Sequence, residues 1–405
     1  MDLRRRLARL ERSVGTHTRK HDETPQLSRE FPDFLGLDKR DGVAGPVWIR
    51  NEVRSVAPPA HDPSVFCGAL TRPIPTDLMW NDVLFLDTET TGLAGGTGTV
   101  PFLVGLAWWE EDSQLHLRQY MLPGPGSEPA MLAELESFAA GFRLLATYNG
   151  HSYDLPLLRT RGILARRRGL LAAHDSWDLL PLARRLWGRR LTDCRQGTVE
   201  QHILGLARDG EDIPGARIPQ TWIDFVREGT AGPLATVLAH NAWDLEGMAG
   251  ILTTAAAVCD TAGKGSALAD AFCWQDRWSL ARLSETRRDR ELEADWIRAA
   301  IAASPLSVIR LDERFGPPPS FFADAVRMLK RTGDWDAVAA LVAGGLCLEP
   351  ASSWLHREAA ILYEHRLPDH LRALGHARRC GEPSRVARLE QRLAASSVAP
   401  EFLRS

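Results

Sequence analysis

The chain has 405 residues and a formal net charge of -3 at pH 7, which excludes a uniformly basic protein that binds polyanions over its whole surface. Hydrophobic residues make up 44% and charged residues 25% of it, as in ordinary globular proteins, and the length predicts two domains with an extension. The six cysteines lie far apart without a C-x-x-C pair, which argues against a zinc ribbon or a disulfide framework and favours a reducing, cytoplasmic location.

Residues 1–80 are predicted to form an N-terminal extension. Residues 1–20 are basic, with Leu3, Leu7 and Leu10 in a narrow apolar stripe, so they predict a helix. This helix is either a nucleic-acid arm, a partner helix or a frayed, solvated terminus. Residues 21–80 are rich in Pro, Asp and Gly, contain one strand-like piece at 46–50, and are expected to pack on the next domain. We expect no signal peptide and no membrane-spanning segment, because no stretch approaches about 18 uninterrupted apolar residues.

Residues 81–258 alternate strand and helix patterns. The apolar run at residues 83–86 predicts a strand that is buried on both faces. Further strands are predicted at residues 102–108, 115–120, 144–148 and 174–177, and helices at 131–142 (with Ser127 as N-cap), from 155 onward and at 233–258. Hairpin-like strands followed by β/α elements predict an α/β fold, a mixed sheet flanked by helices.

The remainder of the chain is predicted to be helical. Residues 259–266 are expected to be a linker, and residues 267–405 an all-α helical-repeat domain. A set of residues with a period of roughly 34 supports the repeat; its members Leu329, Asp336, Leu341 and Glu349-Pro350 recur as Leu362, Asp369, Leu374 and Glu382-Pro383. This pattern resembles tetratricopeptide repeats, whose stacked helix pairs usually form a surface for a protein partner. The alternative is an ordinary helical bundle that caps the α/β domain.

Two acids end the first predicted strand. Asp87 and Glu89 are separated by one residue, so in an extended chain their side chains point the same way. Two unpaired carboxylates on one face are costly unless a cation neutralises them, so the arrangement predicts a divalent metal. A glycine-rich stretch at residues 91–99 follows and allows the backbone to approach whatever binds there. The alternative is a strand-end turn with solvated acids.

Two later segments carry further candidates. Asp154 stands at a strand-to-helix junction, and His240 and Asp244 are four residues apart in the last helix, so both point from one face. Each has a simpler explanation when taken alone. Asp154 could serve the helix dipole, His240 could be a hydrogen-bonded histidine and Asp244 a surface acid. Their combination with the first pair, in this order, favours one acidic site.

These motifs resemble those of the DEDD family of exonucleases over about residues 81–257. The first motif of the family matches DTETTGL at residues 87–93, the second matches residues 149–154, and residues 177–184 resemble the strand and helix that follow. The third motif departs from the family pattern, because three residues separate His240 from Asp244 where the histidine branch has four. With the glycine-rich loop and the helical tail, this spacing resembles the YprB-type branch. The resemblance implies a ribonuclease H-like fold.

The resemblance also implies the chemistry of the site. Two divalent cations, Mg²⁺ or Mn²⁺, would be held by four carboxylates, and His240 would take a proton from the attacking water, for removal of nucleoside monophosphates in the 3′–5′ direction; the metal ligands would be Asp87, Glu89, Asp154 and Asp244. Asp178 would be structural. Candidate nucleic-acid contacts are Thr88, Gly92, Asn149, Tyr153 and Arg159.

The sequence leaves the partners open. The substrate would be DNA or RNA with a 3′ end. The resemblance favours DNA in repair and implies a helicase as a partner for the helical repeats. Nine arginines between Leu155 and Leu191 either follow a phosphate backbone or lie on solvated helix faces. Tyr153 could stack on the terminal base, whereas Phe102 and Tyr148 fit the core better. The rival interpretation is a catalytically silent scaffold that uses the helical repeats to bind nucleic acid or protein.

Overall fold

A seven-stranded sheet forms the centre of the first part of the chain. The computed structural model describes residues 28–70, 72–92, 98–110, 113–206, 208, 212–305 and 317–397. The strand order is β1-β2-β5-β4-β3-β6-β7. The strands are β1 (Asp38–Gly42), β2 (Gly45–Arg54), β3 (Val83–Thr90), β4 (Pro101–Trp109), β5 (Leu115–Met121), β6 (Leu144–Thr147) and β7 (Asp175–Asp178). β3, β6 and β7 run parallel, and the other neighbours are antiparallel, so the predicted mixed sheet is confirmed.

Successive side chains of β3 point to opposite faces of the sheet, and each face has its own hydrophobic cluster. Leu84 and Leu86 pack in one cluster with residues of α2 (Glu128–Ala139), α3 (Asp154–Leu164) and α6 (Ile218–Glu228). Val83 and Phe85 point the other way, into a cluster with residues of α4 (Leu179–Trp187) and α7 (Leu234–Ala262). Side chains two residues apart share a face of a strand, so residues 87 and 89 continue the face of Val83 and Phe85.

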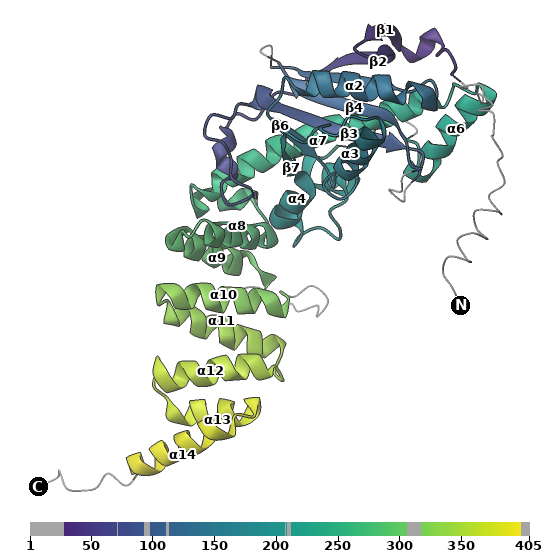
Figure 1. The fold of residues 1–405 in the computed structure, drawn as a ribbon. Helices are drawn as coiled ribbons and strands as arrows, with labels where there is room; N and C mark the ends of the chain where they lie inside the picture. The colour runs from purple at the N-terminus through teal and green to yellow at the C-terminus, as the bar shows by residue number, and fades with distance from the viewer. Residues whose placement is uncertain are drawn as a thin grey trace, which may run out of the picture.

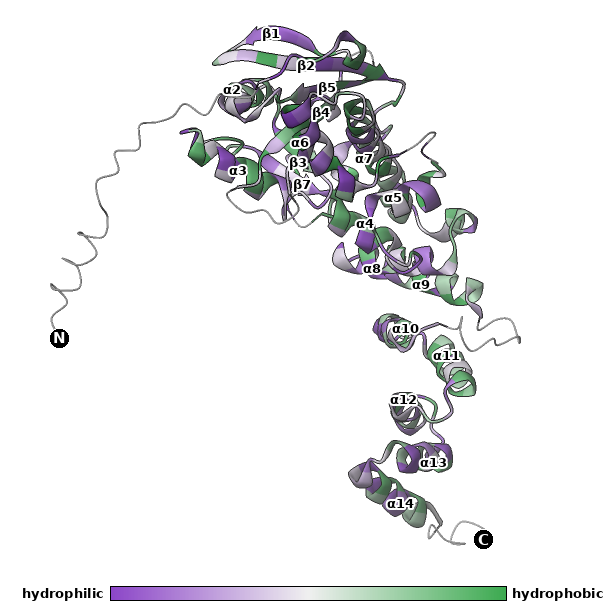
Figure 2. Ribbon diagram, turned by 90° about the vertical axis from the view of Figure 1, so that its right-hand side faces the viewer, coloured by the Kyte–Doolittle hydropathy of each residue, from purple (hydrophilic) through white to green (hydrophobic). Residues whose placement is uncertain are grey.

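The N-terminal extension is part of the sheet, which the sequence did not predict. The strand-like piece at 46–50 belongs to the longer β2, whose residues pair with β5, and β1 pairs back onto β2 through a tight turn. β1 is exposed and polar, as its hydrophilic colouring in Figure 2 shows, and it therefore lacked the apolar alternation that marks a strand. The predicted basic helix over residues 1–20 lies outside the described residues.

Two helix predictions need correction at their ends. α7 continues past Val258 to Ala262 and so takes up part of the segment predicted as a linker. Ser127 precedes α2, but its side chain makes no capping hydrogen bond; it closes a short 3-10 turn, Pro125–Ser127, instead. The remaining short elements are η1 (Asp33–Leu35), η2 (Pro63–Phe66), η3 (Trp80–Asp82), α5 (Gln196–Val199), the π-helical turn η5 (Glu200–Leu204), η6 (Gly215–Arg217) and η7 (Ser266–Ala271).

Helices α8 to α14, which we call the tail, stack in a column that leaves the sheet domain at one end (Figure 1). They are α8 (Trp274–Thr286), α9 (Arg290–Ala303), α10 (Pro319–Thr332), α11 (Trp335–Leu348), α12 (Ser353–His365), α13 (His370–Cys380) and α14 (Pro383–Ser397). An aspartate caps every second helix: Asp289, Asp334 and Asp369 accept hydrogen bonds at the starts of α9, α11 and α13. Repeated helix pairs therefore exist; their assignment to the tetratricopeptide class stays a prediction.

The hydrophobic core continues from the sheet domain into the tail. One cluster of buried residues contains Leu186 of α4, Met248 of α7, Trp296 of α9 and Leu355 of α12. At the junction the guanidinium of Arg189 lies 4.5 Å from the ring centre of Trp278, and its Nη1 donates to Ser279. The tail is thus packed directly on the sheet domain. The division into domains at residues 258 and 266 remains a prediction.

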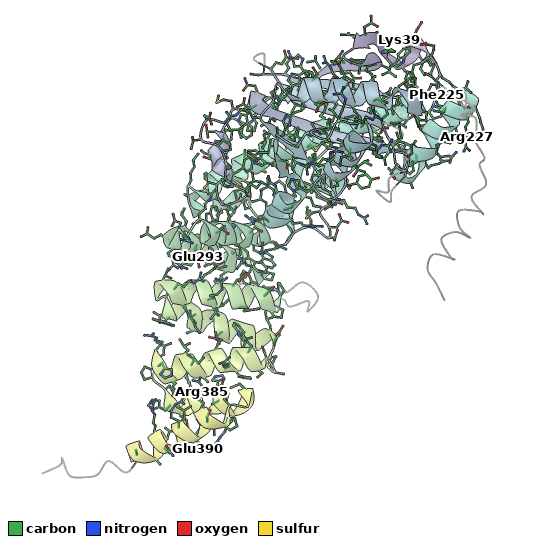
Figure 3. All side chains as sticks on the ribbon, in the orientation of Figure 1. Lys39, Phe225, Arg227, Glu293, Arg385 and Glu390 are labelled. Atoms are coloured by element: carbon green, nitrogen blue, oxygen red, sulfur yellow. The ribbon has the colours of Figure 1, made fainter. Side chains whose placement is uncertain are left out.

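Charged pairs line the tail helices. Figure 3 labels Glu293 of α9 and Arg385 and Glu390 of α14, whose partners are Arg331, Glu364 and Arg378 respectively. Glu293 is buried and accepts from Arg331 of α10 at 2.9 Å. Within the described residues, none of the helices combines the length and the apolar character that crossing a lipid bilayer requires.

Candidate functional site

Strand β3 brings the first two acids to the face of the sheet that α7 covers. Asp87 lies inside the strand, opposite Gly105 of β4, and Glu89 follows on the same face. Both side chains are half-buried or deeper, since β3 is flanked by β4 and β6 and covered by α7. The strand continues to Thr90, past the point where the sequence predicted its end.

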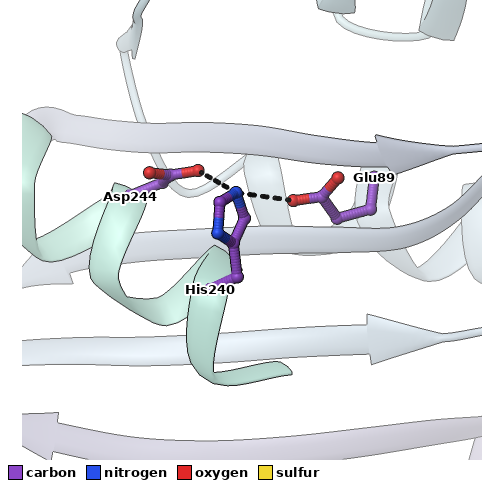
Figure 4. A group of neighbouring side chains, drawn as sticks. All are labelled: Glu89, His240 and Asp244. Atoms are coloured by element: carbon purple, nitrogen blue, oxygen red, sulfur yellow. Dashed lines mark ion pairs between the residues drawn. The ribbon is translucent and has the colours of Figure 1, made fainter. Parts of the chain in front are cut away.

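Helix α7 supplies the histidine and a further acid. His240 lies between the two carboxylates (Figure 4): its Nε2 is 3.3 Å from Asp244 Oδ2 and 4.0 Å from Glu89 Oε1. Ligand atoms of these three residues all lie within 4.8 Å of one another, so they form a candidate metal-binding group. The i, i+4 spacing in the sequence thus does orient both α7 side chains toward the strand, as predicted.

Asp154 joins the site from the start of α3. It is buried, and the hydroxyl of the neighbouring strand residue Thr88 donates to its Oδ1. The loop before it is fixed by Asp178, whose Oδ1 accepts from the backbone N–H of Asn149 at 2.8 Å and from that of Leu180 at 3.0 Å. Asp178 therefore has the structural role that was expected of it.

The charges of the acids interact strongly. Burial, and then the charges of Asp244 and Asp154, raise the pKa of Asp87 well above its ordinary value. Burial and the charges of Asp87, Asp244 and Asp154 do the same to the pKa of Glu89. Burial raises the pKa of Asp154 to about 6, although the hydrogen bond from Thr88 opposes this. The charges of Asp87, Asp154 and Asp244, from three distant segments of the chain, thus raise the pKa of Glu89. Among the described residues, the group whose ligand atoms lie within 4.8 Å of one another contains Glu89, His240 and Asp244 but not Asp87 or Asp154.

The chemistry of these groups fits divalent cations. Within the described residues, no lysine or arginine forms an ion pair with Asp87, Glu89 or Asp154. Each of these carboxylates is thus buried among like charges without a protein cation to offset them, which is costly. Carboxylate oxygens are the ligands that Mg²⁺ and Mn²⁺ prefer. The donor set therefore suits the predicted metals.

Asp244 has a cationic partner that the sequence analysis missed. Arg208 donates to Asp244 and to Glu200, with its Nη2 at 3.0 Å from Glu200 Oε2. Glu200 is buried next to Gly247, where a Cβ would come within 2.0 Å of its Oε1. The Nη1 of Arg208 also pairs with Asp212 at 3.1 Å. Nothing in the sequence linked these residues to α7, because an Arg and an acid four apart occur on many surfaces.

Asp212 in turn contacts the histidine, with its Oδ1 at 2.6 Å from His240 Nδ1. Partial burial raises the pKa of Asp212. The hydrogen bond and charge of His240, together with the charge of Arg208, lower it further than burial raises it, so the pKa lies below its ordinary value. An open pocket of about 600 Å³ adjoins this group, lined by residues that include Gln201, Arg208, Asp212, His240 and Asp244. Solvent or a ligand can therefore reach the imidazole from this side.

The residues predicted to contact nucleic acid have different positions and roles in the structure. The Tyr153 hydroxyl donates to Gly92 O at 2.5 Å and lies 2.8 Å from Thr90 Oγ1, so it fixes the end of β3. Asn149 has a left-handed backbone, with φ 63. Arg159 is exposed on α3. Residues 93–97 of the glycine-rich loop lie outside the described residues. Contacts of these residues and of Thr88 with nucleic acid stay predictions.

Most of the nine arginines between Leu155 and Leu191 bind protein groups instead of being available to a phosphate backbone. Arg161 pairs with Glu128 and Arg167 with Glu136, so α3 and the loop after it are tied to α2. Three others also contact protein groups. Arg185 donates to Gly68 O and Ala69 O, Arg189 lies over the ring of Trp278, and Arg190 forms an ion pair with Asp276. Phe102 and Tyr148 are also used by the protein: Phe102 stacks on Trp222, and the Tyr148 hydroxyl donates to Cys194 O.

Comparison with known proteins agrees with this fold. Residues 84–256 match the model of the RNase_H superfamily, and with the mixed sheet and its flanking helices they form a ribonuclease H-like domain. Proteins with this domain are typically nucleases that use divalent metals. The chain is also 40% identical over 166 residues to a protein of Bacillus subtilis (strain 168) that is named "Uncharacterized protein YprB". The match covers 41% of this chain and 40% of that protein, so it spans under half the length of the relative.

Proposed function

We propose that the sheet domain is a metal-dependent 3′–5′ exonuclease that hydrolyses phosphodiester bonds of nucleic acid. The observation that supports this most directly is the group of buried carboxylates, Asp87, Glu89 and Asp154, which have no lysine or arginine partner within the described residues. The ribonuclease H-like fold supports the nuclease class, and the DTETTGL motif supports the exonuclease branch.

In this proposal Asp87, Glu89, Asp154 and Asp244 hold two divalent cations. When bound, such cations stabilise charge on a phosphate and lower the pKa of water. The protein contributes the position of the acids and a proton acceptor. His240 presents Nε2 to the site, and its Nδ1 faces the carboxylate of Asp212, so Nε2 is the nitrogen left to accept a proton. Thr88 and Asp178 hold Asp154 and the loop before it in place.

The direct test is a set of end-labelled DNA and RNA strands incubated with the full-length protein in Mg²⁺ or Mn²⁺. We expect stepwise release of mononucleotides from 3′ ends and no cleavage in excess chelator. Asp87→Asn should lower the rate by more than about 10²-fold, beyond the range for residues that only support a ligand. A suitable control is Asp224→Asn, which changes a partly exposed acid of α6 paired with Gln220. Undiminished cleavage by the Asp87 variant would contradict the proposal.

The tail supports a second, separate part of the proposal. Its stacked helix pairs and regularly spaced aspartate caps agree with a tetratricopeptide-like array that binds a protein partner. By resemblance to the YprB-type branch, this partner could be a helicase that supplies DNA ends during repair. If the protein binds nucleic acid through the tail but hydrolyses none, the silent scaffold becomes the better interpretation.

A further inference from the structure

A buried asparagine lies directly against the strand acid at the centre of the site. Asn241, the residue after His240 on α7, is fully buried. Its Nδ2 donates to Asp87 Oδ2 at 2.7 Å. This is a buried hydrogen bond to a carboxyl oxygen, and such bonds are shortest and strongest when the acceptor is ionised. Asn241 therefore controls one of the two oxygens of Asp87.

The asparagine is itself held by a second amide. Gln119 of β5 is buried, and its Nε2 donates to Asn241 Oδ1 at 2.9 Å and to Leu238 O at 2.8 Å. Its Oε1 has no hydrogen-bond partner within the described residues. A flipped amide would place this oxygen against two other oxygens, so the orientation of Gln119 is fixed, and it fixes that of Asn241 in turn. The Nδ2 of Asn241 must then face Asp87.

The sheet leaves room for this arrangement at Gly105. Asp87, Gly105 and Gln119 are register neighbours on β3, β4 and β5. The side chain of Asn241 occupies the place above Gly105, where a Cβ would come within 2.1 Å of Asn241 Oδ1. The glycine thus allows an amide of α7 to bridge the residues on either side of it.

We propose that Asn241, oriented by Gln119 above Gly105, is a positioning residue that fixes the Asp87 carboxylate for divalent cations. One oxygen of Asp87 accepts from the amide, and the carboxylate is held at one angle to the neighbouring acids. The proposal rests on the proposed function, since it assigns Asp87 to a cation site. It predicts that the affinity of the protein for Mn²⁺ depends on an amide that does not touch the cation.

The test measures Mn²⁺ binding to the full-length protein by calorimetry, with cleavage measured separately. Asn241→Leu keeps the size of the side chain but removes both amide groups, and we expect Mn²⁺ affinity to fall by about 10–100-fold, the range for residues that orient metal ligands. Gln119→Leu leaves Asn241 in place without its orienting donor and should give a smaller loss of the same kind. Gly105→Ala should displace the amide and resemble Asn241→Leu.

The control is Thr253→Val on the same helix, which removes a hydroxyl that has no partner within the described residues. It should leave Mn²⁺ affinity unchanged. Melting temperatures in chelator separate a general loss of stability from a specific effect, because a core-filling role would lower them without changing Mn²⁺ affinity. If Asn241→Leu does not fold, the Gln119 variant decides the question.

Two results would overturn the inference: Mn²⁺ affinity within about twofold of the wild type in a folded Asn241 or Gln119 variant, or a wild-type protein that binds no Mn²⁺. A wild type that binds Mn²⁺ with dependence on Asn241, yet cleaves neither DNA nor RNA, would support the inference while contradicting the proposed nuclease function. The two proposals can therefore fail separately.

Discussion

Asp212 Oδ1 lies 2.6 Å from His240 Nδ1, closer than the guanidinium of Arg208, which is 3.3 Å from the same nitrogen. Two lone pairs would repel each other at such a distance, so this ring nitrogen carries the proton and donates it to the carboxylate. The other nitrogen, Nε2, is turned toward Asp244 and Glu89. A base oriented by a third group is the arrangement that many hydrolytic sites use.

For the histidine itself, we expect His240→Ala to lower the rate of strand cleavage by about 10²-fold or more, the range for general base catalysis. Mn²⁺ should still bind, because the four carboxylates remain. Steady-state cleavage and calorimetry on the same preparation would measure both. His202→Ala, which removes an exposed histidine of η5, is the matched control. An unchanged rate in the His240 variant would mean that another group accepts the proton.

The role of Asp212 can be separated from general structure by a double-mutant cycle. Asp212→Asn should lower turnover by about tenfold or more with little change in KM, since it withdraws the group that orients the base. In the His240→Ala background the same change should have almost no effect, because the interaction it removes is already absent. Equal losses in both backgrounds would show that Asp212 acts independently of the histidine.

The buried acids predict a pH dependence of stability for the metal-free protein. The pKa of Asp154 is raised from 3.8 to about 6, and those of Asp87 and Glu89 are also raised. A carboxyl with a higher pKa in the folded state stabilises fully below its unfolded pKa, and the contribution is lost as pH rises through the folded value. We therefore expect the free energy of unfolding in chelator to fall from about pH 4 to pH 7. Denaturant unfolding should show a smaller fall for Asp154→Asn; an equal fall would contradict this assignment.

In the tail, Glu364 is buried between arginines of α14, with Arg385 Nη1 at 2.7 Å and Arg388 Nε at 2.9 Å. The hydrogen bond from Arg388, against the effect of burial, lowers the pKa of Glu364 to about 2. Its stabilisation is thus present above the unfolded pKa of about 4.5 and lost as pH falls toward 2. Glu364→Gln should cost about 1.5–3 kcal/mol at pH 7.

The difference in unfolding free energy between wild type and the Glu364 variant should shrink below pH 4.5, where the wild-type carboxyl begins to lose its advantage. The control is Glu390→Gln, since Glu390 forms an exposed pair with Arg378 and should cost only about 0.2–1 kcal/mol. Equal effects of the two substitutions would contradict a special role for Glu364. Denaturant titrations followed by helical circular dichroism would measure these differences.

Local sequence patterns predicted the elements whose burial shows in their own residues, such as a strand made of consecutive apolar side chains. The run at residues 83–86 is buried on both sides and was recognisable as a central strand, whereas β1 is a polar edge strand with no apolar alternation. The end of α7 was misjudged because Cys259 and Ala262 are buried against the tail, which is a tertiary effect that no local signal marks. Stability of that last turn comes from packing.

The site was predictable where acids stood in a regular element. Asp87 and Glu89 share a strand face, and His240 and Asp244 share a helix face, so spacing alone oriented them. The residues that support them were not predictable: Gln119 and Asn241 meet only because β5 and α7 are brought together across Gly105. Arg208 and Asp212 stand outside the regular elements, and their contacts with each other and with Asp244 of α7 follow no local pattern.

The junction of the tail has a mechanical consequence. Just beyond the end of α4, Arg189 contacts Trp278 and Ser279 of α8, and Arg190 donates to Asp276 of α8. At the start of α4, Asp178 accepts a hydrogen bond from Asn149 in the loop that leads to Asp154. α4 therefore connects the tail at one end with the loop that leads to Asp154 at the other. A displacement of α8 relative to the sheet would therefore act, through α4, on the loop before Asp154.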